Sequence, residues 1–238
     1  KALYIAHPHG YTSVHGHLQK FSPDIEAYIK DLQYRKQSYE VETIPDYGTL
    51  TLDKGDLIAY SGNTGGSSGP HLHFEIRNSL NEKPLNPLHY GFEVRDATNP
   101  TLQAVYAYPL SEGAVVNRSS RRVKLSYRRQ ADGSYLTDSL NATGRIGFGV
   151  QAFDRQDMAA NRNGIYRMRQ QVDGTTHTDL EFTSFSFGET RYINTLIDYP
   201  YYARHRRRIM KCFRDAGNRL SMYNTVVQDG QIAVAAGT

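Results

Sequence analysis

Residues 61–77 read SGNTGGSSGPHLHFEIR, and the last seven letters of this stretch decide the fold around it. The apolar residues at every second position predict a β-strand over 71–77. Because strand side chains alternate between two faces, His71, His73 and Glu75 share one face, and the apolar residues between them share the other. The apolar face is expected to pack into the core, which leaves two imidazoles on a rigid element.

The residues ahead of this strand indicate an open, tight loop. Gly62–Gly69 is rich in glycine, which lets the backbone turn with little side-chain obstruction. Pro70 begins the strand at a position where no ladder N–H is needed. Neutral imidazole is a common zinc ligand, but a bare His-x-His pattern is also found among ordinary structural histidines.

Upstream, two further strands are expected to form a hairpin. Residues 2–6 (ALYIA) predict a buried strand, HPHG at 7–10 has turn chemistry, and 11–18 (YTSVHGHL) alternate well enough for a second strand. His17 lies on this second strand, which can pair near residues 71–77. The sequence therefore predicts a third imidazole close to the other two.

One helix is expected over residues 23–36. Ser22 suits the N-cap, Pro23 suits the first helical position, and apolar residues follow at helical spacing. Short strands are predicted after it at 39–44, 49–52 and 57–62. The first domain, residues 1–92, is thus expected to be mostly antiparallel β with one inserted helix.

Residues 93–238 are expected to form a second, all-β domain. Short strand-like runs separated by turns give the rhythm of a β-sandwich. The run GETRYINTLIDYPYYARHRRR at 188–208 interrupts this rhythm and can carry a helical turn or two before Pro200.

Composition excludes some classes of protein. The chain has 238 residues, 39% hydrophobic and 22% charged, with a formal net charge of +4. This surplus is smaller than the strong basic footprint of a nucleic-acid binder, so no nucleic-acid partner is expected. The single cysteine, Cys212, excludes an intrachain disulfide framework, and no apolar stretch is long enough to span a membrane.

The basic run Arg204–Arg208 (RHRRR) leaves two interpretations open. It can be a binding patch for an anionic partner, or a solvated face, which isolated charge clusters usually are.

Residues 1–92 resemble the M23 (lysostaphin/LytM-type) zinc metallopeptidases. The resemblance is carried by KGDLIAYSGNTGGSSGPHLHFEIR at 54–77, with GYTSVHGHL upstream at 10–18. The family has a Gly-rich segment ending in H-L-H-F-E, preceded by a Y/H-x-H-L segment. The later half of the chain is similar to the Ig-like β-domain attached to M23 units in Bacteroidetes-type exported proteins.

The resemblance implies three roles. His73, the second histidine of HLH, would be a zinc ligand. His71, the first, and His17, in HGHL, would be catalytic histidines that orient and deprotonate the attacking water or stabilise the oxyanion. The implied cofactor is Zn²⁺, which would polarise the scissile carbonyl.

The sequence departs from the family at the other two zinc ligands. The family has a His and an Asp on a stretch before the first strand seen here, and a catalytic zinc usually needs three protein ligands. We expect these ligands upstream of Lys1, in a longer protein of which this chain is an N-terminally truncated part. Substitution by His7 or His9 is a weaker alternative, and His15 is interpreted as a residue lining the cleft.

The resemblance implies a zinc metalloendopeptidase that hydrolyses the peptide cross-links of bacterial peptidoglycan, with the peptide stems as partner. The expected location is extracytoplasmic, in the periplasm or cell envelope. The alternative is a catalytically inactive LytM-like scaffold that binds cell wall or activates a partner hydrolase. A His and an Asp upstream of Lys1 would favour the enzyme over the scaffold.

Overall fold

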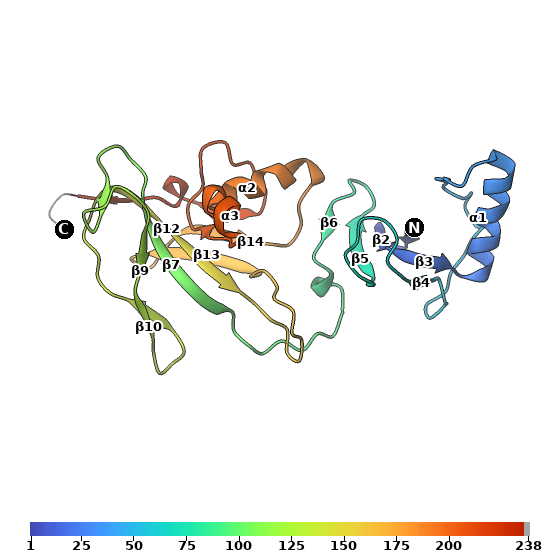
Figure 1. The fold of residues 1–238 in the computed structure, drawn as a ribbon, viewed down its shortest axis with the longest axis horizontal. Coiled ribbons are helices and arrows are strands. Elements are labelled where there is room, and N and C mark those ends of the chain that lie inside the picture. The colour runs from blue at the N-terminus through green and yellow to red at the C-terminus, as the bar shows by residue number, and fades with distance from the viewer. Residues whose placement is uncertain (236–238) are drawn as a thin grey trace. The chain divides into compact units, whose positions relative to one another are not determined.

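A computed structural model describes residues 1–235. The chain divides between Leu85 and Asn86 into two compact units, both mostly of antiparallel β-structure (Figure 1). The helices within residues 1–235 are too short and too polar to cross a lipid bilayer. The fold class expected from the sequence, mostly β with one inserted helix in the first unit, is confirmed.

The first unit is built on a four-stranded sheet in the order β1-β2-β5-β6, with β3 and β4 forming a separate pair. Its elements are β1 (Leu3–His7), β2 (Tyr11–Gly16), β3 (Leu18–Phe21), α1 (Pro23–Lys36), β4 (Ala59–Ser61), β5 (His73–Asn78) and β6 (Pro84–Leu85). Because β2 pairs with both β1 and β5, the hairpin is joined directly to the strand that carries His73.

The inserted helix begins and ends at the predicted residues. Pro23 occupies its first turn, and Gln37 ends it in the left-handed conformation. Ser22 precedes it as expected, but its side chain makes no capping hydrogen bond. Ile25 packs with Leu18 and Phe21 in the core cluster of this unit. The apolar stripe of the helix therefore holds it against the strand that follows His17.

Five strand predictions in the first unit need correction. The strand predicted over 11–18 ends at Gly16, so His17 follows it, and the strand predicted over 71–77 begins at His73, so His71 precedes it. Residues 39–44 and 49–52 form no strand, and Tyr39 and Ile44 are 95% exposed. Strand-forming residue types stabilise a strand only where a neighbouring strand and a packed face are present. The first strand, predicted to be buried, is half exposed because β1 is the edge of its sheet.

The second unit contains a six-stranded sheet, a three-stranded sheet and a two-stranded ribbon. Its strands are β7 (Thr101–Pro109), β8 (Val115–Val116), β9 (Val123–Leu125), β10 (Tyr127–Arg129), β11 (Tyr135–Thr137), β12 (Ala142–Phe153), β13 (Arg167–Val172), β14 (Thr175–Glu181), β15 (Met210–Lys211), β16 (Tyr223–Val226) and β17 (Ile232–Val234). Phe148 and Val150 of β12 pack against a cluster that contains Met168 and Leu180, so side chains of both larger sheets share a core.

Helical segments interrupt the strands before Pro200, as the sequence indicates, and a further helix that the sequence does not predict runs past this proline. They are α2 (Ile193–Leu196) and α3 (Tyr199–His205), preceded by a 3-10 helix at Phe187–Tyr192; further 3-10 turns lie at Pro87–His89 and Gln228–Gly230. Asp198 caps α3, since its carboxylate accepts a hydrogen bond from the Tyr201 N–H. The basic run begins within the last turn of this helix.

Candidate active site

Three histidines gather at one end of the β2–β5 pair. His73 begins β5 opposite Gly16, and His17 directly follows β2. His71 lies just before β5, in an isolated bridge with Gly62. The His17 ring centroid is 4.6 Å from that of His71 and 5.8 Å from that of His73. The structure therefore brings together the three histidines that the sequence predicts as site residues.

The loop before β5 orients His17. The Nδ1 atom of His17 lies 2.8 Å from the Thr64 carbonyl oxygen, and the Thr64 hydroxyl donates a hydrogen bond to the Leu18 carbonyl. A carbonyl oxygen only accepts hydrogen bonds, so Nδ1 of His17 carries the proton. In the neutral ring, Nε2 is then left with a free lone pair.

His71 is held in the same tautomer. Its Nδ1 atom lies 2.8 Å from the Gly69 carbonyl oxygen and 3.2 Å from Ser67 Oγ. Nδ1 therefore donates to Gly69, and the lone pair of Nε2 remains available. With two neighbouring imidazoles, each with a free Nε2, one ring can accept a proton from a water molecule and, once protonated, donate to a developing oxyanion.

His73 is held in the opposite tautomer. Its Nε2 atom lies 2.5 Å from Glu75 Oε1, and Glu75 also accepts a hydrogen bond of 2.7 Å from Arg77 Nε. Burial of Glu75 favours its protonated form, but hydrogen bonds from Arg77 and His73 outweigh this and hold its pKa below the usual value. A charged carboxylate accepts the Nε2 proton of His73, which leaves Nδ1 free to bind a metal. Metal-binding histidines commonly have such a carboxylate partner on the other nitrogen.

Gly16 is required where β2 passes His73. A Cβ atom at Gly16 would lie 3.1 Å from His73 Cβ, closer than ordinary van der Waals contact. The absence of a side chain there lets the ring of His73 stand beside His17.

The described residues match a metal site only in part. His73 has the hydrogen-bond partner that suits a ligand, but within residues 1–235 no group of three or more His, Cys, Asp or Glu side chains could hold a metal ion. A catalytic zinc needs three protein ligands. The residues described here therefore do not complete a zinc site by themselves.

The histidines weighed as substitutes lie elsewhere. The register pairs His15 with Phe74, so His15 is on the sheet face opposite His73, and the interpretation of His15 as a neighbour of the site is wrong. Ser13 Oγ lies 2.7 Å from His7 Nε2 and 3.0 Å from His15 Nε2. Desolvation, and then His7, lowers the pKa of His15.

The remaining histidines belong to other contacts. His9 lies in the β1–β2 turn with φ 70°. His89 packs edge-on against Tyr166, and His205 stacks on Tyr201 with 4.4 Å between the ring centroids. His89 and His205 thus make aromatic contacts within the second unit.

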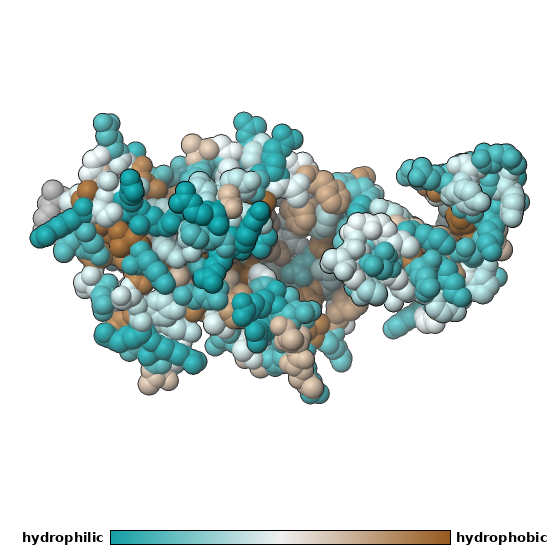
Figure 2. All heavy atoms as spheres, viewed as in Figure 1, coloured by the Kyte–Doolittle hydropathy of each residue, from teal (hydrophilic) through white to brown (hydrophobic). Residues whose placement is uncertain are grey.

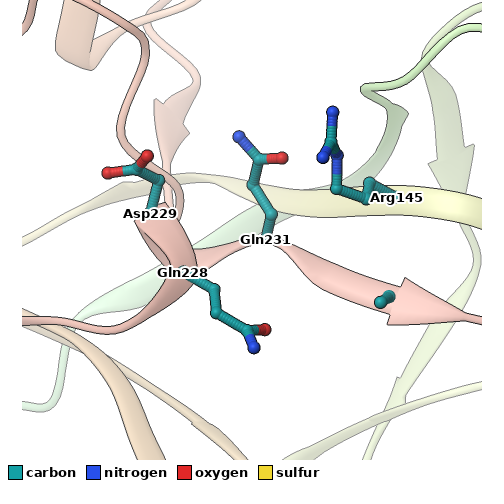
Figure 3. A pocket seen from close by; sticks show the side chains of 5 residues that line it. Arg145, Gln228, Asp229 and Gln231 are labelled. Atoms are coloured by element: carbon teal, nitrogen blue, oxygen red, sulfur yellow. The ribbon is translucent and has the colours of Figure 1, made fainter.

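A separate depression of about 480 Å³ lies in the second unit and contains no histidine (Figure 3). Its lining is mostly polar, and comes from Arg145, Gln228, Asp229, Gln231 and Ala233. It contains none of the residues that the resemblance singles out.

Comparison with known proteins matches the segment that carries two of the three site histidines, while His17 lies outside it. Residues 49–87, which include His71, His73 and Glu75, match the profile of peptidase family M23. The chain is 55% identical over 38 residues to an "uncharacterized metalloprotease" of Haemophilus influenzae, covering 16% of this chain and 8% of that protein. It is 26% identical over 117 residues to the "DD-carboxypeptidase/endopeptidase Mpg" of Neisseria meningitidis, covering 49% of this chain and 21% of the relative. No solved structure matches significantly.

Proposed function

We propose that this chain carries part of the active site of an M23-type zinc metalloendopeptidase that hydrolyses the peptide cross-links of bacterial peptidoglycan. The observation that carries the proposal is the arrangement of three histidine rings with complementary tautomers: free Nε2 atoms on His17 and His71, and a free Nδ1 on His73. The family match over residues 49–87 and the two relatives support a peptidase.

The proposal divides the work between the histidines. Either His17 or His71 accepts the proton of the attacking water at Nε2, and the N–H that forms there donates to the oxyanion. His73 contributes one metal ligand through Nδ1, and Glu75 keeps this nitrogen unprotonated. When bound, zinc polarises a carbonyl and lowers the pKa of its water. Further ligands have to come from outside the described residues.

The substrate and the location are the more specific parts of the proposal. The relative from Neisseria meningitidis is named a DD-carboxypeptidase/endopeptidase, an activity on D-amino-acid peptides. Peptidoglycan stem peptides contain such residues, so we propose them as substrate and an extracytoplasmic location for the protein.

The test uses the full-length natural protein with zinc and measures peptide release from purified peptidoglycan. We expect the His17→Ala and His71→Ala variants to lose about 10²–10⁴-fold in rate, as expected for lost acid–base catalysts. His73→Ala should lose both zinc and activity. His9→Asn is the matched control, because His9 lies in a turn with φ 70° that asparagine tolerates, and it should keep full activity.

One result would replace the proposal with a scaffold role. If the natural protein binds zinc stoichiometrically, or binds peptidoglycan, but releases no peptide, the chain is not an endopeptidase of this class. If His9→Asn lost as much activity as His71→Ala, the three histidines would no longer be assigned as the active site.

A further inference from the structure

The basic turn, Arg204–Arg208, is the most concentrated charge in the chain. It contains four arginines and one histidine, and all five residues are exposed. Strongly hydrophilic side chains cover the region of α3 in the space-filling view (Figure 2). The four arginines together equal the net charge of the whole chain, +4. The positive charge of this one short segment is therefore as large as the net charge of the whole chain.

Hydrogen bonds and a buried residue flank this segment. Arg206 ends α3 in the left-handed conformation, and its N–H donates to the Tyr202 carbonyl at 2.8 Å. Directly after the turn, Ile209 is fully buried, and its carbonyl accepts the Asp198 N–H at 2.9 Å. Both ends of the turn are therefore anchored, so a partner does not have to order it.

Two tyrosine rings contact cationic or ring side chains of the basic turn. The Cζ atoms of Arg208 and Arg206 lie 5.0 Å and 5.9 Å from the centroid of Tyr202, and His205 stacks on Tyr201. A guanidinium over a ring face keeps its in-plane N–H donors free. These contacts hold the arginines in position without using the groups that bind an anion.

No carboxylate within residues 1–235 lies within ion-pair distance of these four arginines. Other arginines of the same unit are paired, for example Arg122 with Asp198 and Arg214 with Asp229. Clustered like charges repel one another, and an anionic partner would remove that cost. Besides being exposed, the turn is anchored on both sides, and two of its four arginines lie over the Tyr202 ring.

We propose that the basic turn binds the carboxylates that repeat along peptidoglycan stem peptides and so tethers the second unit to the wall polymer. The proposal rests on the proposed function. An arginine fork matches a carboxylate with two parallel hydrogen bonds. The residues are exposed and line neither of the two described pockets, which suits a polymer with repeated charges over a single enclosed anion. Each contact is weak alone, and repetition along the polymer adds to the affinity.

The test measures co-sedimentation of the protein with purified peptidoglycan sacculi over a range of salt concentrations. The test variant carries Arg206→Gln, Arg207→Gln and Arg208→Gln. The control variant carries Arg118→Gln, Arg128→Gln and Arg129→Gln, which remove the same charge from exposed positions, two of them on β10, away from α3 (Figure 1). Circular dichroism checks that both variants are folded.

We expect the test variant to bind about tenfold more weakly with a flatter salt dependence, and the control variant to bind like wild type. Sacculi whose carboxyl groups have been converted to amides should bind wild type as weakly as the test variant binds untreated sacculi. Equal binding by test variant and wild type overturns the proposal. So does undiminished binding to amidated sacculi, or turn-dependent binding to anionic lipid vesicles with none to sacculi.

Peptide release is measured separately on the same proteins. If wild type binds through the basic turn but releases no peptide, the tether stands and the endopeptidase proposal fails. If wild type releases peptide and all three proteins bind equally, the endopeptidase proposal stands and the tether fails.

Discussion

At the scale of single residues, the three site histidines differ in which nitrogen is protonated. Backbone carbonyls accept from Nδ1 of His17 and His71, whereas the carboxylate of Glu75 accepts from Nε2 of His73. A neutral histidine can carry its proton on either ring nitrogen, and a hydrogen-bond acceptor beside one nitrogen selects one of the two tautomers. The difference between the proposed acid–base groups and the proposed metal ligand therefore originates in the acceptors around the rings.

The first prediction concerns these tautomers. In long-range ¹H–¹⁵N spectra of the metal-free protein at neutral pH, His73 should be the Nε2–H form, and His17 and His71 the Nδ1–H form. Glu75→Ala should let His73 populate both forms, because its acceptor is lost. Glu82→Asn is the control, since Glu82 contacts Arg77 at 3.3 Å without contacting His73. An unchanged His73 spectrum in Glu75→Ala would contradict the assignment.

At the scale of elements, the loop at 62–69 and β5 depend on one another. The Gly62 carbonyl accepts the His71 N–H at 3.0 Å, which ties the start of the loop to its end. A Cβ atom at Gly62 would lie 2.7–2.8 Å from the backbone N and Cα of Gln19. Backbone atoms cannot move aside as a flexible side chain can, so this glycine keeps the loop against β3.

The second prediction compares two glycines of this loop. Gly62→Ala should destabilise the first unit by about 1–3 kcal/mol, the usual cost of overpacking, and should broaden or shift the His71 resonances. Gly66→Ala should change neither, because no atom lies within 4 Å of its added Cβ. Urea denaturation followed by tyrosine fluorescence measures the stability. Equal effects of the two substitutions would refute the argument from the Gln19 contact.

The β13–β14 pair provides a pH-dependent element. Asp179 of β14 is buried, and Arg167 Nε and Nη2 donate to it at 2.7 and 2.5 Å. Hydrogen bonds from Arg167, and further ones from Arg169, hold the pKa of Asp179 down to about 2, although burial opposes this. Because the pKa is lower in the folded state, the ionised carboxylate stabilises the fold above its unfolded pKa of about 3.9 and loses this contribution as pH falls toward 2.

The third prediction follows from that sign. Asp179→Asn should lower the melting temperature by roughly 3–6 °C at pH 6, and the difference from wild type should shrink between about pH 4 and pH 2. Asp138→Asn is the control, because its pair with Arg128 is exposed on both sides and 3.8 Å long. Differential scanning calorimetry measures both. A difference that stays constant from pH 6 to pH 2.5 would show that the charge of Asp179 is not responsible.

At the scale of the whole molecule, the sequence predicts the elements with strong local signals. The helix at 23–36 has its proline and apolar stripe and appears as predicted, whereas the strand predicted over 71–77 from its alternation begins only at His73. Residues 39–44 also favour a strand by composition, but no neighbouring strand covers them. Register is a long-range property, and it moves His15 to the face opposite His73. The backbone carbonyls that orient His17 and His71 have no signal in the sequence at all.

The two units differ in how much core they contain. The buried cluster of the first unit consists of Leu18, Phe21 and Ile25, whereas the second unit has larger buried clusters. One of these contains Cys212, the single cysteine of the chain. A thiol inside this core reports the packing of the second unit specifically, because no other thiol competes.

The fourth prediction uses this thiol as a probe. Burial raises the pKa of Cys212 to about 12, so at pH 8 roughly one thiol in ten thousand is the reactive thiolate, and the surrounding side chains exclude the reagent as well. Folded protein should therefore react with a disulfide reagent at least 100-fold more slowly than protein in denaturant, where one thiol per chain reacts. The urea midpoint for labelling should coincide with that for loss of β-structure in the second unit.

Leu180 packs in the same cluster as Cys212. Leu180→Ala should therefore lower the free energy of unfolding by about 2–5 kcal/mol and shift both midpoints together to lower urea concentration. Rapid, complete labelling of the folded protein would contradict the packing of this core.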